Sequence, residues 1–180
     1  MPSGRTHDRI TFGLFPLIVG SSYWLTQSWI LTAWCAGGFL FSGLMFGPDL
    51  DIYSLQYKRW GWLRWLWLPY QKFVPHRSVF SHGFVVGTAI RIIYLLTVIF
   101  FLIASSVAIA QLAWGFDWNW QRLIVLELND IRGQHWWELI VLLFGLELGA
   151  MSHYVSDFIT SRQIKKRKKL QNRLRKLRKH

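Results

Sequence analysis

Long apolar blocks limit what this chain of 180 residues can fold into. Four blocks, at about 10–27, 29–47, 83–110 and 136–158, approach or exceed the roughly 20 apolar residues that a helix needs to cross a bilayer. Hydrophobic residues make up 52% of the chain, which is typical of a membrane protein. We therefore expect an all-α protein, a polytopic membrane helical bundle with about four transmembrane helices.

The positions of proline and glycine indicate how these helices pack. Pro16 interrupts the first block, and a very short link joins it to the second, so the two should form a tight helical hairpin. Glycines recur four residues apart in the other three blocks, and in lipid this spacing allows helix backbones to approach closely. The pairs are Gly43 and Gly47, Gly83 and Gly87, and Gly145 and Gly149.

Between the second and third blocks, residues 52–75 interleave tryptophans with basic side chains over a stretch too short to cross a bilayer. Indole rings favour the headgroup layer and cations favour anionic lipid. The segment is therefore predicted to be an interfacial aromatic loop, and a protein–protein contact face is the alternative. The residues concerned are Trp60, Trp62, Trp65 and Trp67 with Lys58, Arg59, Arg64 and Lys72.

The net charge of +12 comes from the C-terminus. Residues 162–180 hold eleven of the 21 lysines and arginines and no acidic residue, so the rest of the chain is nearly neutral. This composition divides the chain into a membrane-embedded helical domain, 1–161, and a basic tail, 162–180. Leu170, Leu174 and Leu177 recur at helical spacing, so the tail is predicted to be a helix that binds anionic lipid, RNA or an acidic protein partner. The alternative is a solvated run of charges that mainly fixes the topology. The tail has no aromatic residue, so base stacking is unsupported.

Basic residues also predict an orientation. If the four blocks alternate in direction, the N-terminus, the 48–82 loop and the tail share one side, and the 111–135 loop lies on the other with only Arg122 and Arg132. By the positive-inside rule, the first side is cytoplasmic. We expect an integral membrane protein with both termini in the cytoplasm.

Imidazoles and carboxylates gather at the helix ends on this same side. His153 and Asp157 are four apart and would share one helix face. Asp49 and Asp51 flank one residue after a proline, an extended arrangement that would point two carboxylates toward the same region or to two adjacent ions. With one cysteine in the chain, a thiolate cluster is excluded. The predicted metal ligands are His7, Asp49, Asp51, His76, His82, His153 and Asp157.

A mixture of imidazole and carboxylate donors suits a divalent metal, zinc first and manganese or iron as alternatives. The donors suffice for one or two ions, with Asp49 or Asp51 as a bridge. Each residue also has a simpler interpretation, as an interfacial histidine or a helix stop. Asp8 is more easily explained as a cap of the first helix than as a ligand.

Three further charges bear on the site. Arg77 lies between His76 and His82 and would clamp a phosphate through its planar guanidinium, or serve as an interfacial anchor. Arg91 and Glu147 lie deeper in their blocks, and their opposite charges predict an ion pair. Glu147 as an extra ligand or base is the alternative.

Three stretches carry a resemblance to a known family: Pro-Ser-Gly-Arg-Thr-His-Asp-Arg-Ile-Thr from Pro2, Ser-Gly-Leu-Met-Phe-Gly-Pro-Asp-Leu-Asp-Ile-Tyr-Ser from Ser42, and His-Arg-Ser-Val-Phe-Ser-His-Gly from His76. The chain resembles an uncharacterised family of metal-binding membrane proteins known from cyanobacteria, and is similar to membrane-bound metal-dependent hydrolases. The resemblance covers about residues 1–160. It implies the same seven ligand positions and, for the wider group, hydrolysis.

The sequence thus favours a metal-dependent hydrolase acting on a lipid or another phosphoester at the cytoplasmic membrane face, with Asp51 and Arg77 as candidate catalytic groups. A second hypothesis is a non-enzymatic membrane scaffold that binds through the basic tail. A divalent-metal transporter ranks last, because the donors cluster at one face instead of the bilayer midplane.

Overall fold

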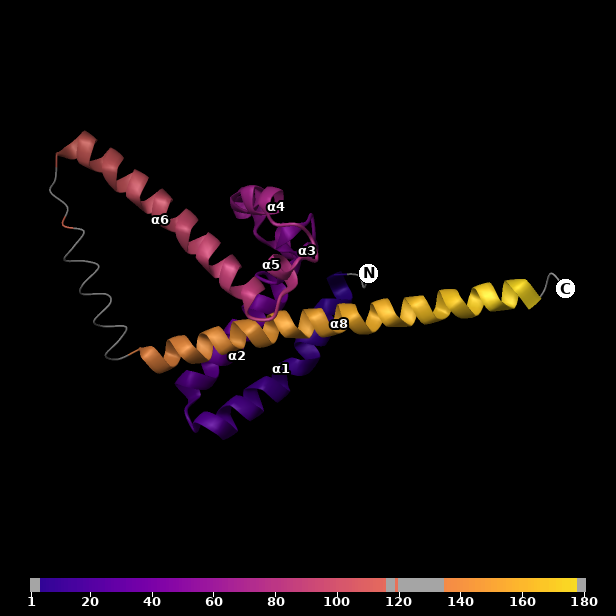
Figure 1. Ribbon diagram of the computed structural model, residues 1–180. Coiled ribbons are helices and arrows are strands. Elements are labelled where there is room, and N and C mark those ends of the chain that lie inside the picture. The colour runs from indigo at the N-terminus through magenta and orange to yellow at the C-terminus, as the bar shows by residue number, and fades with distance from the viewer. Residues whose placement is uncertain (1–3, 116–118, 120–134, 178–180) are drawn as a thin grey trace.

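The computed structural model describes residues 4–115, 119 and 135–177, and every regular element in these ranges is a helix (Figure 1). The long helices are α1 (Gly4–Thr26), α2 (Trp29–Leu44), α6 (Val86–Trp114) and α8 (Trp136–Leu177). Between α2 and α6 the chain forms five short helices: η1 (Pro48–Asp51), α3 (Leu55–Arg59), η2 (Gly61–Trp67), α4 (Leu68–Phe73) and α5 (Val79–His82).

Helices α1 and α2 form the predicted hairpin, and both lie along α8 (Figure 1). Only Gln27 and Ser28 separate them, and the Ser28 hydroxyl caps α2 by accepting a hydrogen bond from the Leu31 N–H. The predicted cap of α1 is wrong. Asp8 lies inside α1, where the Arg59 guanidinium donates to both of its carboxylate oxygens at 2.9 and 2.6 Å.

The seam between α2 and α8 confirms one of the predicted glycine contacts. A Cβ atom on Gly145 would collide with the Cys35 carbonyl oxygen, and one on Gly149 would collide with the carbonyl oxygen of Phe39. The two backbones therefore touch where α8 passes α2, and only glycine allows this distance. This contact fixes the position along α8 from which His153 faces α1.

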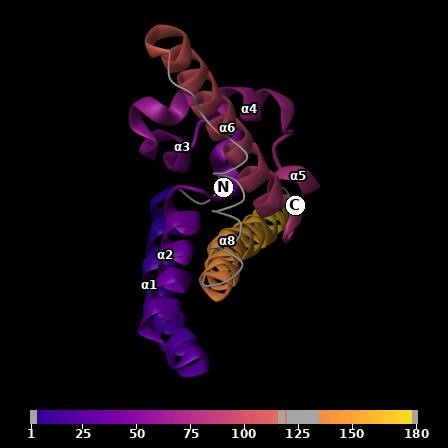
Figure 2. The ribbon, with the colours of Figure 1, turned by 90° about the vertical axis from the view of Figure 1, so that its left-hand side faces the viewer.

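Within the described ranges, three helical segments are long and apolar enough to cross a membrane: Trp29–Asp51, Val86–Trp114 and Trp136–Gln171. The prediction of about four spans is thus reduced to these three, because polar and small residues interrupt α1. In the described part of the chain, none of the apolar window of α6 is buried, and α6 diverges from the hairpin (Figure 2). Its mean hydropathy of 2.7 makes it the most membrane-like helix described.

The short helices between α2 and α6 enclose an aromatic core centred on Trp67, which is fully buried. Its ring packs edge-on against Phe46, Trp60 and Tyr70 at centroid distances of 5.1 to 5.7 Å. The prediction that all four tryptophans of this segment lie at the surface is therefore wrong for Trp67. Trp60 is partly buried as well.

The predicted ion pair between Arg91 and Glu147 is not formed, because each side chain has other partners. The fully buried Arg91 donates from Nη1 to the Ser81 carbonyl oxygen and from Nη2 to Thr88 Oγ1, both at 2.9 Å. Glu147 accepts the backbone N–H of Val85 at 3.0 Å. That N–H precedes the first turn of α6, where a carboxylate is favoured by the helix dipole.

At the C-terminus, α8 continues without a break across residue 161, the predicted domain boundary, and extends beyond the other helices (Figure 1). The predicted outer loop, 111–135, falls largely outside the described residues, including Arg122 and Arg132.

Candidate metal centre

The fold brings all seven predicted donors together from four separate segments. His7 lies on α1, and Asp49 and Asp51 lie on η1. His76 precedes α5, His82 is the last residue of α5, and His153 and Asp157 lie on α8. Successive nitrogen-to-oxygen distances of 2.9 to 4.0 Å join them into one continuous cluster. These contacts are those among the residues that the structure describes.

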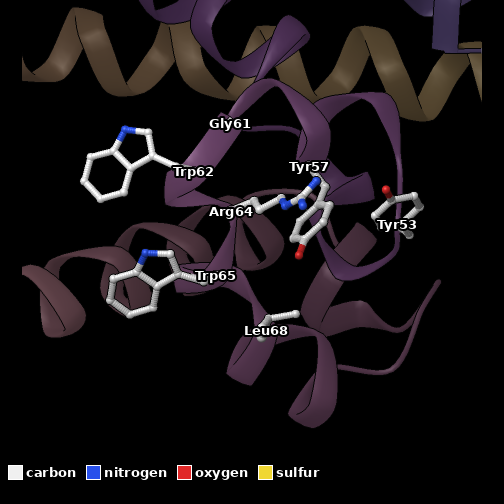
Figure 3. A pocket seen from close by; sticks show the side chains of 7 residues that line it. All are labelled: Tyr53, Tyr57, Gly61, Trp62, Arg64, Trp65 and Leu68. Atoms are coloured by element: carbon white, nitrogen blue, oxygen red, sulfur yellow. The ribbon is translucent and has the colours of Figure 1, made fainter.

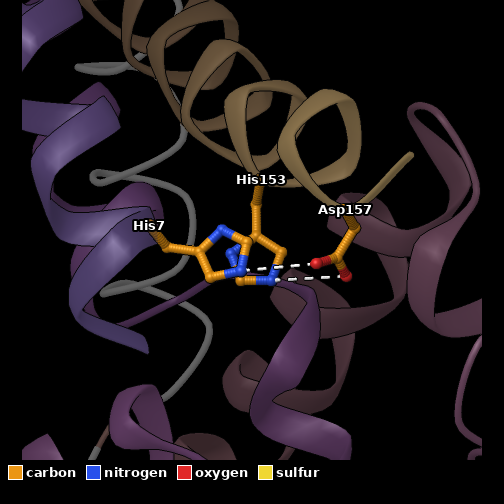
Figure 4. A group of neighbouring side chains, drawn as sticks. All are labelled: His7, His153 and Asp157. Carbon is orange, nitrogen blue, oxygen red and sulfur yellow. Dashed lines mark ion pairs between the residues drawn. The ribbon is translucent and has the colours of Figure 1, made fainter. Parts of the chain in front are cut away.

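The first part of the cluster, called here the helix group, consists of His7, His153 and Asp157. His153 and Asp157 share a face of α8, as their spacing of four predicts, and His7 approaches from α1 (Figure 4). The two imidazole rings are stacked, with centroids 3.8 Å apart and planes 15° apart. His7 Nε2 lies 3.3 Å from Asp157 Oδ1, and both histidines are buried.

The second part, called the loop group, consists of Asp49, His76 and His82. These residues lie on turns that prolines help to define, because Pro48 begins η1 and Pro75 directly precedes His76. All three side chains are partly exposed, at 16 to 25%. Within each group, the ligand atoms lie within 4.8 Å of one another.

Asp51 takes a different place from the one that the sequence predicts. Residues 48–51 form a 3-10 turn, not an extended strand, so side chains two residues apart point in different directions. The fully buried Asp51 carboxylate lies 2.9 and 3.1 Å from His76 Nδ1, and it is absent from both groups of three. Asp51 therefore orients an imidazole in this structure, and its role as a ligand, bridge or catalytic group stays a prediction.

This hydrogen bond fixes the tautomer of His76. Because Nδ1–H donates to Asp51, the lone pair lies on Nε2, which is buried and has no hydrogen-bond partner. An imidazole held by a carboxylate through one nitrogen and left open at the other is the usual arrangement of a metal-ligating histidine.

His82 is held in the same way by a serine. The Ser81 hydroxyl donates to the Pro75 carbonyl oxygen at 3.1 Å, so its oxygen is left to accept from His82 Nδ1–H at 2.9 Å. Burial lowers the pKa of His82, partly offset by the charge of Asp51, so the ring is neutral near pH 7. Its unpartnered Nε2 faces Asp49 Oδ1 at 3.8 Å.

Asp49 connects the two groups. Its Oδ1 lies 3.8 Å from His82 Nε2, and its Oδ2 lies 3.2 Å from His153 Nε2. One carboxylate oxygen is thus directed to each side, which is the geometry of a bridging ligand between two cations.

The spacing of the donors suits coordination of divalent cations better than it suits hydrogen bonds among the donors. Buried nitrogens of His7, His76, His82 and His153 have no hydrogen-bond partner, although buried polar atoms nearly always have one. For a cation about 2.0–2.2 Å from each donor, tetrahedral geometry separates the donors by roughly 3.3–3.6 Å. The measured separations between donors of 3.2 to 4.0 Å span that value and are too long or too bent for hydrogen bonds.

Two supporting residues are missed by the sequence analysis. Arg91 holds the Ser81 carbonyl oxygen and so fixes α5 beneath His82, and the Ser81 hydroxyl orients the ring. A hydroxyl next to a histidine is the sequence signal that points to Ser81. No local pattern points to Arg91, because its acceptor is a backbone atom ten residues away.

Arg77 is exposed between the two histidines of the loop group, with a φ of 61° that is unusual for a residue other than glycine. This backbone turn separates His76 from Ser78, the residue that caps α5.

Comparisons with known proteins concern the chain as a whole and name no ligand residues. No solved structure matches the chain. An uncharacterized protein of Aquifex aeolicus (strain VF5) is 36% identical over 59 residues, which cover 32% of this chain and 41% of that protein. This chain thus spans less than half of that relative. A family model described as "Uncharacterized metal-binding protein (DUF2227)" matches residues 2–168, nearly the whole chain and every donor discussed above, so the chain belongs to this family of metal-binding proteins.

Proposed function

We propose that the protein is an integral membrane protein that binds two divalent metal ions and hydrolyses a phosphoester at the cytoplasmic membrane face. The observation that carries the proposal is the convergence of unpartnered imidazole nitrogens and carboxylates from four segments, with Asp49 between them.

Membrane insertion is supported by α6 above all. A helix of 29 residues with a mean hydropathy of 2.7 and no buried part in its apolar window, among the described residues, needs an apolar environment. Asp49 lies in the last turn of one candidate span, and His82 lies four residues before the start of the next. The cluster therefore belongs at one end of the spans, near the level of the headgroups.

The donor chemistry favours zinc, because imidazole and carboxylate ligands in sets of three leave a further position open. When bound, such cations lower the pKa of a water molecule and polarise a phosphoryl oxygen. In this proposal the helix group would hold one ion and the loop group the other, and Asp49, a member of the loop group, lies between them.

The remaining residues orient the metal-binding histidines and recognise the substrate phosphate. Asp51 and Ser81 keep Nε2 of His76 and His82 directed inward. Arg77, exposed at the loop side, offers a planar pair of donors to a phosphate. The substrate enters on this side, because the helix group is closed by burial.

Elemental analysis of the purified full-length protein tests the metal assignment. The wild type should carry about two divalent ions per chain, and a His82→Ala variant should lose at least one. His135→Ala is the matched control, because His135 lies outside the cluster and should leave the metal content unchanged. Equal metal content in all three proteins would refute the site.

Hydrolysis is tested separately with bis(p-nitrophenyl) phosphate and with a phospholipid in mixed micelles. The proposal expects turnover that disappears with a chelator, returns with zinc and is absent in His82→Ala. A protein that holds its metal but turns over neither substrate contradicts hydrolysis and leaves metal binding standing. Membrane insertion is a third readout, since alkaline carbonate should not extract the protein from membranes.

A second candidate function is a membrane scaffold, favoured by the extension of α8 beyond the bundle. This extension exposes Arg162 and the basic run 166–169. Deletion of residues 162–180 separates the two functions: an enzyme keeps most of its turnover, whereas a scaffold loses binding to anionic vesicles, RNA or an acidic protein.

A further inference from the structure

A second site lies on the short helices between α2 and α6, away from the metal centre. Here an open pocket of about 580 Å³ is lined by Tyr53, Tyr57, Trp62, Arg64, Trp65 and Leu68 (Figure 3). None of its lining residues belongs to the helix group or the loop group.

The pocket follows from the local helix type. In a 3-10 helix, side chains three residues apart lie above one another, so Trp62 and Trp65 line up along one edge of η2, and Leu68, the first residue of α4, follows at the same spacing. That edge faces outward, with Trp62 79% and Leu68 54% exposed, while Leu66 and Trp67 turn into the core. The segment therefore presents an apolar ridge at the surface while its opposite edge packs in the core.

The pocket carries positive charge and no negative charge. Arg64 projects between the two indoles and the two tyrosines in Figure 3. Next to it, the Lys58 ammonium lies 4.7 Å from the centre of the Tyr53 ring, a cation–π contact that holds this lysine at the rim. No lining residue is acidic. The ligand that fits is an anion with an apolar part.

The position of the pocket in the chain indicates which class of anionic ligand it meets. Tyr53 follows the end of the candidate span Trp29–Asp51 by two residues, and α4 precedes the span Val86–Trp114. A segment between two spans lies at a membrane–water boundary, where exposed indoles and cations meet phospholipid headgroups.

We propose that this pocket binds one anionic phospholipid. The lipid phosphate accepts hydrogen bonds from the Arg64 guanidinium, with Lys58 nearby, and the glycerol and first acyl carbons pack on Trp62, Trp65 and Leu68. The site rests on the membrane location in the proposed function, but it is independent of metal and of hydrolysis.

The test uses the full-length protein in a neutral detergent, titrated with phosphatidylglycerol or phosphatidylcholine and followed by native mass spectrometry. The wild type should retain phosphatidylglycerol at lower lipid concentration than phosphatidylcholine. Arg64→Gln should weaken phosphatidylglycerol binding by about fivefold, the effect of one cation at a lipid surface, and should weaken phosphatidylcholine binding less, because choline already balances that phosphate.

Matched variants separate a built pocket from diffuse attraction. Lys72→Gln removes an exposed cation of the same segment that does not line the pocket, and Trp24→Ala removes an exposed indole at the far end of α1. Neither should change lipid retention, whereas Trp62→Ala should weaken both lipids. Equal effects of Arg64→Gln and Lys72→Gln would overturn the pocket.

Two further outcomes are decisive. Displacement of the lipid by millimolar inorganic phosphate would mean that the site takes free phosphate, which contradicts a phospholipid site. A protein that carbonate extracts from membranes refutes the proposed membrane location, whereas a membrane-bound protein without lipid preference refutes the pocket alone.

Discussion

The helix group and the loop group use the same chemistry, imidazole and carboxylate, on different supports. His7 and His153 are carried by long helices that pack along their length, and their rings are buried and stacked. His76 and Asp49 are carried by short turns, and their side chains remain partly exposed. The helix group is suited to hold an ion firmly, and the loop group is suited to expose one to substrate.

The difference between the two groups shows how one fold can combine affinity for metal with access for substrate. Side chains on packed helices have little freedom, so a ligand set there is organised before metal arrives. A ligand set on turns needs additional bonds to reach the same order, and here Asp51 and Ser81 provide them. Asp49, which faces both sets, makes the two halves depend on each other.

The largest effect is expected from Asp49→Asn, which removes the link between the groups. The amide keeps the volume but loses the charge and one acceptor oxygen, so the loop ion should be lost, the helix ion weakened and turnover abolished. Asp8→Asn is the matched control, because the Asp8 side chain is 19% exposed against 20% for Asp49. Metal content should be unchanged in Asp8→Asn, and the same loss in both variants would contradict a bridge.

Next in size is the comparison of His153→Ala with His76→Ala. If the groups hold separate ions, each variant should retain about one ion per chain, measured by elemental analysis. The ion that stays in His76→Ala should exchange more slowly with chelator, because the helix group is buried. Loss of both ions in both variants would show a single shared site.

A smaller effect should follow from Asp51→Asn, because Asp51 hydrogen-bonds to the loop group only at His76 Nδ1 and lies 3.8 Å from His82 Nδ1. Loss of an orienting partner of this kind weakens metal binding by about 10- to 100-fold. Competition with a chelator should find this change at the loop ion and no change at the helix ion. An unchanged loop affinity would mean that His76 needs no such support.

The smallest effect is expected from Arg59→Gln. Arg59 joins α3 to Asp8, one residue beyond His7, and also donates to the Leu44 carbonyl oxygen at 2.8 Å. A partly exposed, bidentate ion pair contributes about 1 kcal/mol, so the melting temperature should fall by about 2–4 °C. Metal affinity should hold, because helix packing fixes His7. If Arg59→Gln weakens metal binding while the melting temperature falls by no more than this, Arg59 positions the helix group.

Several features could be predicted from local sequence patterns. Apolar blocks predicted the long helices, and the spacing of four predicted that His153 and Asp157 share a face. The glycine pair Gly145 and Gly149 predicted a close helix contact. Each of these depends on periodicity within one segment, and periodicity is visible in the sequence.

Other features required the folded chain. Asp49 and Asp51 are the same residue type two positions apart, and only the 3-10 turn decides that Asp49 faces both groups while Asp51 lies behind a histidine. Arg91 was predicted to pair with Glu147 from charge and depth alone, yet it binds a backbone oxygen.

The sequence by itself therefore determined which residues have the chemistry to hold a metal and near which helix ends they lie. The tertiary structure decided which nitrogens of His76 and His82 are free and which carboxylate connects the two groups. The reason is that side-chain direction in a turn and partners across distant segments are set by packing, and no local pattern encodes packing.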